Sequence, residues 1–413
     1  MKQANFNNEN QTSIKLAELL SNIKPSPTIA VSMKAAELKA QGKNIISLGM
    51  GEPDFDTPDN IKQAAIAAIN AGKTKYTAVD GTKEIKDAII NKFQKENNLS
   101  YSAKEIIVST GAKQAIYNAL IASVNKGDEV IIPAPYWVSY PDMVLLANGS
   151  PVILETTSQN NFRVKPEDLA QKITPNTKWL LLNSPSNPTG SCYTQDELKA
   201  IGDLLEQHPH VNIICDDIYE HLIFDDLEFK TLAEICPNLI NRILIINGVS
   251  KAYSMTGWRI GYAACKDQKL IKAMSMIQSQ STSCPSSVGQ AAAVEALSGD
   301  QSFIKSNAKL FQGRRDMLVK MLNDIDGIEC NVPNGAFYVF PSCSGLVGKK
   351  TPNGNIINND ADFVSYLLEE SLVAAVQGSA FGSEGFFRIS YAASEEFLKD
   401  AMERIALACK KLS

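Results

Sequence analysis

The chain has 413 residues, which is enough for two or three domains and a large buried core. Apolar residues make up 44% and charged residues 21%, as in globular proteins, which argues against intrinsic disorder. The formal net charge is −5, whereas a sequence-independent nucleic-acid binder usually carries a basic excess, so we expect no nucleic-acid partner. No apolar stretch approaches about 18 residues, so we expect no membrane-spanning helix.

The eight cysteines are scattered without a C-x-x-C pair, and the polar N-terminus lacks the apolar core of a signal peptide. We therefore expect a soluble, cytoplasmic protein whose cysteines are mostly small buried hydrophobic residues. The three histidines are His208, His210 and His221, and the first two flank a proline in a predicted loop. A zinc site or a histidine-based triad is therefore disfavoured, and we expect no metal.

Residues 1–12 are expected to form a disordered tail. From about residue 104, short apolar runs alternate with helical patterns. The predicted strands cover residues 105–109, 129–133, 151–154, 179–183, 211–215, 242–247 and 258–265. Short, continuously apolar strands separated by helices are typical of an α/β fold with a mainly parallel sheet covered on both faces.

After about residue 273 the pattern changes, and this change predicts a second, smaller α+β domain. Helices are predicted over 272–297 and 302–325, then strands at 335–340 and 386–391, with helices near 361–371 and from Ser394 onwards. The expected division is an N-terminal segment that joins the small domain (13–60), a large domain (61–300) and a small C-terminal domain (301–413).

Lys251 lies in NGVSKAYSMTGWRIGY, directly after a predicted strand. A lone lysine there is usually a solvated charge. Here, however, Asn187, Asp216 and Tyr219 also follow predicted strands, and Arg259 begins another. The carboxyl ends of parallel strands form the ligand crevice of an open sheet, so these groups are expected to converge. Together they would suit an anionic cofactor with an aldehyde, with which the lysine can form a Schiff base.

The segment STGAKQ (109–114) is predicted to turn from a strand into a helix. The amides of Gly111, Ala112 and Lys113 would then face an anion at the positive end of a helix dipole. Arg259 would pair with the same anion. Alone, such a turn is a weak signal, because many helices begin after a glycine.

Asp216 and Tyr219 occur in IICDDIYEHL, and Trp137 occurs in APYWVSYP. Each has a structural alternative: the aspartate can cap a helix, and the two aromatic residues can pack in a core. As parts of a site, the carboxylate would keep a pyridine nitrogen protonated and the phenol would donate to a ring oxygen. The indole would stack on the ring.

SPSNPTG (184–190) is the most specific short motif, because a plain turn would need no such order of residues. Asn187 would supply a side-chain donor at the strand end. Arg388 lies in the short apolar strand FFRISY, where an unpaired charge would be costly. A substrate carboxylate would resolve that cost, and an internal salt bridge is the alternative.

Together these motifs resemble the fold-type I, pyridoxal-phosphate-dependent aminotransferases of class I, in particular the bacterial aspartate/prephenate subgroup. The resemblance runs from about residue 23 to the C-terminus and also includes KPSPTIAV, GEPDFDTP, KTKYT and GAFYVF. It implies a large domain with a mostly parallel, seven-stranded type of sheet, a smaller α+β domain, and a homodimer with shared active sites.

By this resemblance, Lys251 carries pyridoxal 5'-phosphate as a Schiff base and moves the substrate proton. Asp216 pairs with the ring nitrogen, Tyr219 and Asn187 bind the ring oxygen, and Trp137 stacks on the ring.

The resemblance also assigns residues to the phosphate and to the substrate. The phosphate would be held by Gly111, Ala112, Lys113 and Arg259, with Tyr76 from the neighbouring subunit. The substrate α-carboxylate would be held by Arg388, with Asn187, Trp137 and the backbone of Gly51. Lys24 in KPSP matches a lysine that the subgroup uses for the distal carboxylate of dicarboxylic substrates.

The expected reaction is amino-group transfer between aspartate and 2-oxoglutarate, with prephenate as an additional candidate acceptor. An aminotransferase for aromatic or other amino acids, or a lyase with the same cofactor and fold, is the alternative. A transcriptional regulator of this fold is disfavoured, because the roughly 22 residues before the resemblance are neither basic nor similar to a helix-turn-helix.

Overall fold

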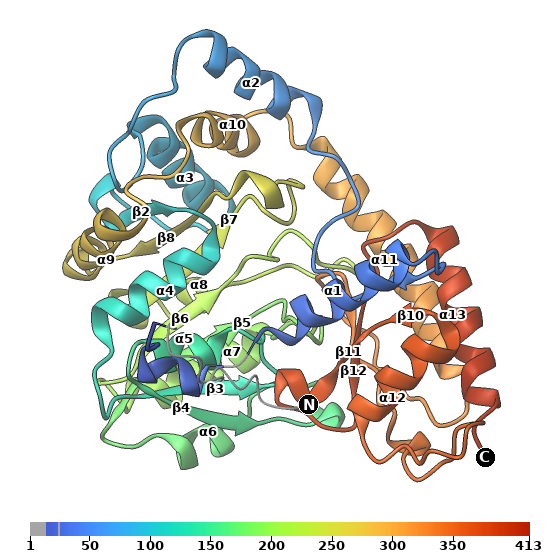
Figure 1. Cartoon of the computed structure of the whole chain (residues 1–413). Coiled ribbons are helices and arrows are strands. Elements are labelled where there is room, and N and C mark those ends of the chain that lie inside the picture. Colours follow the sequence, from blue (N-terminus) through green and yellow to red (C-terminus); the bar gives the residue numbers. More distant parts are fainter. Residues whose placement is uncertain (1–13, 24) are drawn as a thin grey trace.

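The computed structural model describes residues 14–413 except residue 24. Its largest sheet has seven strands in the order β2-β8-β7-β6-β5-β3-β4 (Figure 1). These strands are β2 (Ile106–Ser109), β3 (Glu129–Ala134), β4 (Ser150–Glu155), β5 (Thr177–Asn183), β6 (Asn212–Asp216), β7 (Ile243–Gly248) and β8 (Gly261–Cys265). Strand β8 runs antiparallel to β2 and β7, and the other neighbours pair in parallel. The predicted α/β class with a mostly parallel sheet is confirmed.

Helices cover both faces of this sheet (Figure 1). One face packs against α4 (Ala112–Ser123), α5 (Tyr140–Leu146) and α9 (Gln268–Ser281). The other packs against α2 (Asp59–Asn70), α3 (Lys83–Glu96), α6 (Pro166–Lys172), α7 (Gln195–Glu206), α8 (Leu232–Ile235) and α10 (Ser287–Ser298).

The alternation of side chains along each strand explains the two cores. On β5, Leu180 and Leu182 belong to the core shared with α7, while Leu181 belongs to the core shared with α4 and α9. Because both faces are covered, both sets of side chains are apolar. The strands therefore read as continuous apolar runs in the sequence.

The helical stretch predicted over 272–297 is interrupted. Helix α9 ends at Ser281, and α10 begins at Ser287 after Ser286, whose hydroxyl accepts a hydrogen bond from the Gly289 amide. Pro285 lies between the two helices and lacks the backbone N–H that a continuous helix would use.

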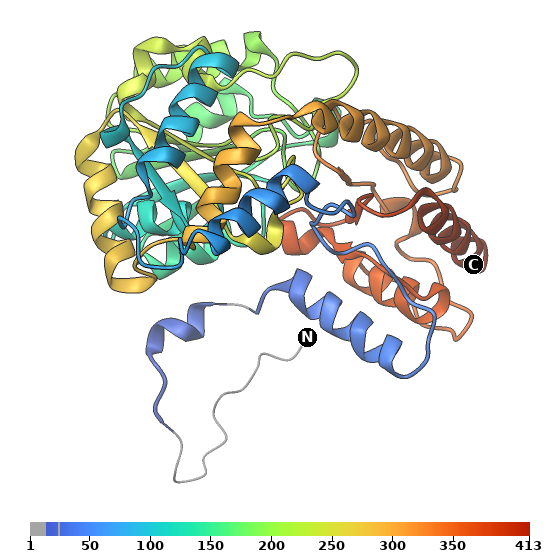
Figure 2. The ribbon, with the colours of Figure 1, turned by 90° about the horizontal axis from the view of Figure 1, so that it is seen from above.

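The small part of the molecule lies beside one edge of the large part (Figures 1 and 2). Its helices are α1 (Pro27–Ala40), α11 (Ser302–Asn323), α12 (Asp360–Tyr366) and α13 (Glu395–Lys410). Its strands are β1 (Ile46–Ser47), β9 (Tyr338–Val339), β10 (Val373–Ala374), β11 (Val376–Gln377) and β12 (Phe387–Ser390). Strand β1 pairs in parallel with β10, so the N-terminal segment packs against the C-terminal region.

Shorter elements complete the chain. They are 3₁₀ turns at Glu18–Asn22, Ala103–Glu105, Ser158–Asn160, Pro237–Arg242, Thr256–Trp258, Ser344–Leu346 and Gly378–Phe381, and a π-helical turn at Leu367–Ser371 that extends α12. The boundaries at residues 60 and 300 stay predictions, and the predicted tail over 1–12 lies outside the described residues. None of the helices that the structure describes has the length and apolar character to cross a membrane.

Candidate active site

A cavity of about 580 Å³ lies at the carboxyl ends of β5, β6 and β7, between the large sheet and the small part. Because parallel strands end at the same edge, side chains that follow different strands meet there. Ten of the residues predicted from the sequence line the cavity: Gly51, Ala112, Lys113, Trp137, Asn187, Asp216, Tyr219, Lys251, Arg259 and Arg388.

Lys251 lies three residues after the end of β7, and its Nζ donates a hydrogen bond to the Gly51 carbonyl at 2.6 Å. None of the ion pairs formed by the described residues includes Lys251. Burial and the nearby charges of Arg388 and Arg259 lower the pKa of this amine to about 8. At pH 7.4 about a fifth of the amine is therefore neutral, far more than for an ordinary lysine, and this neutral form is the one that acts as a nucleophile or a base.

Asp216 is the last residue of β6, and its carboxylate is buried. The Tyr140 hydroxyl donates to Oδ2 at 2.6 Å, and the Ile218 amide donates to Oδ1 at 3.4 Å. Burial raises the pKa of the carboxyl to about 6, although both donors and the charge of Lys251 oppose this shift. The carboxylate is thus placed to bind a cation in the cavity.

Residues 217–222 form a turn and no helix, so the helix-capping alternative for Asp216 is wrong. Because this segment is a turn, Asp216 and Tyr219 do not share a helical face. The turn buries the Tyr219 ring at the cavity wall, where its hydroxyl lies 2.8 Å from the Tyr338 hydroxyl.

The start of α4 and Arg259 form a cradle for an anion. Gly111 caps α4 with φ of 84°, and Arg259 lies so close that a Cβ on this glycine would be 2.3 Å from Nη2. Glycine is therefore required both by the backbone conformation and by the guanidinium. The free amides at the helix start and the guanidinium place positive charge at one point, as an anion such as phosphate requires.

Lys113 and Trp137 lie against each other in the cavity wall. The Lys113 Nζ lies 4.7 Å from the centre of the Trp137 ring, and burial together with Arg259 lowers the pKa of Lys113. Trp137 is half-buried and meets Tyr140 edge to face, with ring centres 5.3 Å apart. Its indole therefore forms part of the cavity wall, as the sequence predicted.

Arg388 is buried on β12, and its guanidinium contacts oxygen atoms that carry no full charge. Nη1 donates to Asn187 Oδ1 at 2.8 Å and Nη2 to the Gly49 carbonyl at 2.6 Å, while Nε has no partner among the described residues. A buried donor without a partner costs about 1–3 kcal/mol. The alternative of an internal salt bridge is therefore wrong, and the guanidinium is available to an anionic ligand.

Three predicted residues do not line this cavity as the structure describes it: Gly111, which caps α4 in the anion cradle, Tyr76 and Lys24. Tyr76 is 89% exposed and does not line the cavity of its own chain. Lys24 lies outside the described residues.

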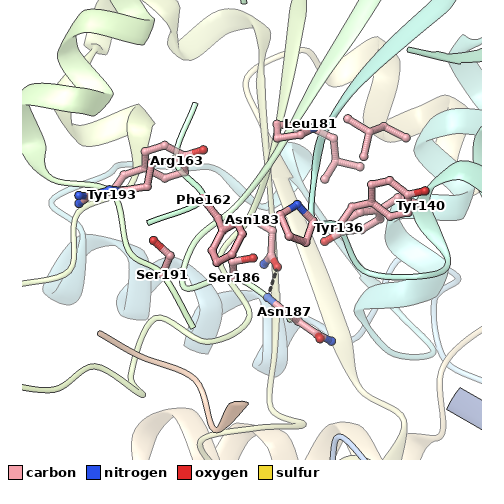
Figure 3. Close-up of a pocket in the computed structure, with 13 residues that line it drawn as sticks. Tyr136, Tyr140, Phe162, Arg163, Leu181, Asn183, Ser186, Asn187, Ser191 and Tyr193 are labelled. Carbon is pink, nitrogen blue, oxygen red and sulfur yellow. Dashed lines mark hydrogen bonds between the residues drawn. The ribbon is translucent and has the colours of Figure 1, made fainter. Parts of the chain in front are cut away.

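Sequence reasoning missed Tyr140 and Tyr338. Tyr140 lies at the start of α5, three residues after Trp137. Its hydroxyl follows a candidate stacking residue by about one helical turn, and this spacing could have indicated a site residue. A smaller cavity shares Tyr140 and Asn187 with the site (Figure 3). Tyr338 lies in GAFYVF, and the sequence does not show that its hydroxyl reaches Tyr219.

Residues 43–405 match the family of class I and II aminotransferases, and the chain belongs to this family. Its members depend on pyridoxal phosphate, and the cradle, the buried amine and the buried carboxylate fit the phosphate, the aldehyde and the ring nitrogen of that cofactor.

Individual relatives are also similar over nearly their whole length. A probable aspartate/prephenate aminotransferase of Rhizobium leguminosarum bv. phaseoli is 59% identical over 394 residues, which cover 95% of this chain and 98% of the relative. An aspartate/prephenate aminotransferase of Cereibacter sphaeroides is 57% identical, with 96% and 99% covered.

Solved structures agree with this assignment. The aspartate aminotransferase of Rhizobium meliloti superposes with a TM-score of 0.95 at 54% identity, over 97% of this chain and 100% of that chain. The aspartate aminotransferase of Thermus thermophilus with maleate gives a TM-score of 0.89 at 40% identity, over 96% and 100%.

The lowered pKa of Lys251 predicts a distinct labelling profile in the cofactor-free protein. At pH 8 about half of this amine is neutral, against roughly one in three hundred for an ordinary lysine. Acetylation at increasing pH, followed by mass spectrometry of the peptides, should therefore reach half its maximal rate near pH 8 at Lys251. The exposed Lys83, whose pKa Asp87 raises, is the control and should react only at higher pH. A Lys251 midpoint at or above that of Lys83 would contradict the described environment.

Proposed function

We propose that this chain transfers an amino group reversibly between aspartate and 2-oxoglutarate, and that prephenate is a further acceptor. Relatives named aspartate/prephenate aminotransferase support this substrate class. The observation that carries the proposal is the buried Arg388, which shares a cavity with Lys251 and forms no ion pair with the described residues. The α-carboxylate of an amino acid would supply the missing negative charge.

The charges around the cavity provide for the cofactor phosphate and for one substrate carboxylate at Arg388. The basic side chains in its wall are Lys113, Lys251, Arg259 and Arg388, and the acidic ones are Glu52 and Asp216. One phosphate, with a charge of about −2, balances the excess of these cations, so a second substrate carboxylate needs a cation beyond this set. We propose that Lys24 binds the distal carboxylate, a role supported by its place in the KPSP motif.

The cofactor, when bound, supplies an aldehyde for condensation with an amine and a ring that withdraws electrons from the reacting carbon. Phosphate binding falls to Arg259 and the amides of Ala112 and Lys113. The Gly111 amide donates to the Ser109 carbonyl at 2.8 Å, so the part of Gly111 is to let the backbone and Arg259 approach closely. Asp216 holds the proton of the ring nitrogen.

Trp137 stacks on the ring of the bound cofactor, and Tyr219 and Asn187 donate to its ring oxygen. In its neutral form, the Lys251 amine would take the proton from the substrate Cα and deliver it to the carbon that the cofactor aldehyde supplies. The Gly51 carbonyl accepts a hydrogen bond from that amine and holds it in place. Trp137 and Asn187 also line the space beside Arg388 where the substrate lies.

We also propose a homodimer with shared sites, in which Tyr76 reaches the phosphate of the partner. The exposure of Tyr76 on its own chain supports this arrangement, because a large aromatic side chain in water gains stability by burial.

A cytoplasmic location is proposed as well. All eight cysteines, each within the described part of the chain, are free, and six of them are buried. Free thiols are typical of a reducing compartment.

A panel of amino donors tests the substrate. With 2-oxoglutarate as acceptor, kcat/KM for aspartate should exceed that for phenylalanine and alanine. Lys24→Ala should lower the value for aspartate about tenfold, the expected effect of losing one charged hydrogen bond, and leave phenylalanine within about twofold. Lys15→Ala removes an exposed lysine on the same segment and should change neither. Unchanged discrimination in Lys24→Ala would refute the specificity, and donor turnover without use of 2-oxoglutarate would favour a lyase.

Mixing two damaged chains tests the shared site. Tyr76→Ala and Lys251→Ala homodimers should each have low activity, because every site lacks one group. In a mixed dimer one site keeps both, so roughly a quarter of wild-type activity should return when equal amounts are mixed and re-equilibrated. Steady low activity, with native mass spectrometry showing mixed dimers, would exclude a Tyr76 contribution from the partner.

A further inference from the structure

Asn183 is a site residue whose side chain joins two predicted cofactor-binding residues. It is the last residue of β5 and lies opposite Asp216 in the register between β5 and β6. Its Nδ2 donates to the Asp216 backbone carbonyl at 2.8 Å, and its Oδ1 accepts from the Asn187 backbone amide at 2.8 Å. Figure 3 shows the second bond as a dashed line between Asn183 and Asn187. The Asn183 carboxamide thus links the end of β6 to the turn that follows β5.

The link continues to the small part of the molecule. The Asn187 side chain accepts a hydrogen bond from Arg388 Nη1 at 2.8 Å, and Arg388 Nη2 donates to the Gly49 carbonyl at 2.6 Å. A chain of hydrogen bonds therefore runs from Asp216 through Asn183 and Asn187 to Arg388. It connects the backbone of Asp216, whose carboxylate is proposed for the cofactor ring, with the guanidinium proposed for the substrate.

Among the described residues, the Asn183 side chain makes the shortest hydrogen bond between this part of the chain and the end of β6. Within the turn, the Gly190 amide donates to the Ser186 carbonyl and the Ser186 amide to the Ser191 carbonyl. The Gly190 carbonyl accepts from the amides of Asn334 and Gly335, which joins the turn to the small part and not to β6. The Ser184 amide also reaches the Asp216 carbonyl, but at 3.4 Å.

We propose that Asn183 is a positioning residue: it fixes the Asn187 turn against the end of β6 and thereby sets the place of Arg388 relative to Asp216. The inference rests on the proposed function, since it assigns the substrate carboxylate to Arg388. A carboxamide suits this role because it offers one donor and one acceptor in a single plane, whereas a carboxylate lacks the donor and an apolar side chain lacks both.

Binding of maleate, a four-carbon dicarboxylate, to the cofactor-loaded protein tests the inference. The dissociation constant is measured by calorimetry for the wild type, Asn183→Ala, Asn187→Ala and the double variant. Asn183→Ala should weaken binding about tenfold, because Asn187 and Arg388 lose their fixed place. In the Asn187→Ala background the same change should have less than about a twofold effect, because the path to Arg388 is already broken. Equal losses in both backgrounds, or no loss at all, would overturn the proposal.

Matched variants separate positioning from general stability. Ser191→Ala removes a buried hydroxyl in the wall of the same small cavity that has no partner among the described residues, and it should bind maleate like the wild type. If Asn183→Ala does not fold, Asn183→Gln keeps the carboxamide but moves it by one methylene group. It should keep the unfolding temperature near that of the wild type and still weaken maleate binding several-fold. Asn183→Gln with wild-type affinity would refute the proposal.

The proposed function and this inference fail in different ways. A wild-type protein that neither binds maleate nor transaminates contradicts the proposed function. A wild-type protein that does both, with Asn183→Ala unchanged, contradicts the positioning role alone.

Discussion

The site depends on positive groups that are buried in one cavity and that form no ion pair with the described residues. Lys251 and Arg388 line one cavity, and neither forms an ion pair with the described part of the chain. Their mutual repulsion, added to burial, lowers the pKa of the Lys251 amine and keeps it reactive. Burying these charges without partners lowers the stability of the folded protein, and binding of an anionic cofactor and substrate offsets that loss. Ligand binding and chemical reactivity therefore have one electrostatic origin.

Three parts of the chain have to meet for this arrangement to exist. The carboxyl ends of β6 and β7 bring Asp216 and Lys251, and β12 of the small part brings Arg388. The N-terminal segment, held by the pairing of β1 with β10, supplies the carbonyls of Gly49 and Gly51 that accept from the arginine and the lysine. A shift of the small part would move Arg388 and both carbonyls together, so substrate binding and the place of the amine are mechanically coupled.

Much of this arrangement could be predicted from the sequence, because it depends on local patterns. Continuous apolar runs indicated the strands, and Lys251, Asp216 and Asn187 each follow one directly. The antiparallel direction of β8 was not predictable, since an apolar run reads the same in both directions. The turn after Asp216 was also missed, because the sequence that follows suits a helix start as well as a turn.

Long-range hydrogen bonds were the least predictable feature. The bond from Tyr140 to Asp216 joins residues 76 positions apart, and the bond from Arg388 to Asn187 joins residues 201 apart. Composition and periodicity carry no information about such pairs. The hydrogen bonds that hold the site residues in place could therefore be identified only from the structure. The unpaired charge of Arg388, in contrast, was expected from a single arginine in an apolar strand.

The central claim is that the Lys251 amine is the group that holds the cofactor aldehyde. The most direct test is borohydride reduction of the cofactor-loaded protein, which fixes the cofactor to its amine, followed by peptide mass spectrometry. The account predicts one modified peptide that contains Lys251, and loss of the label in Lys251→Ala. A label on Lys113 or on another lysine with Lys251 unmodified, or no label in a protein that transaminates, would contradict it.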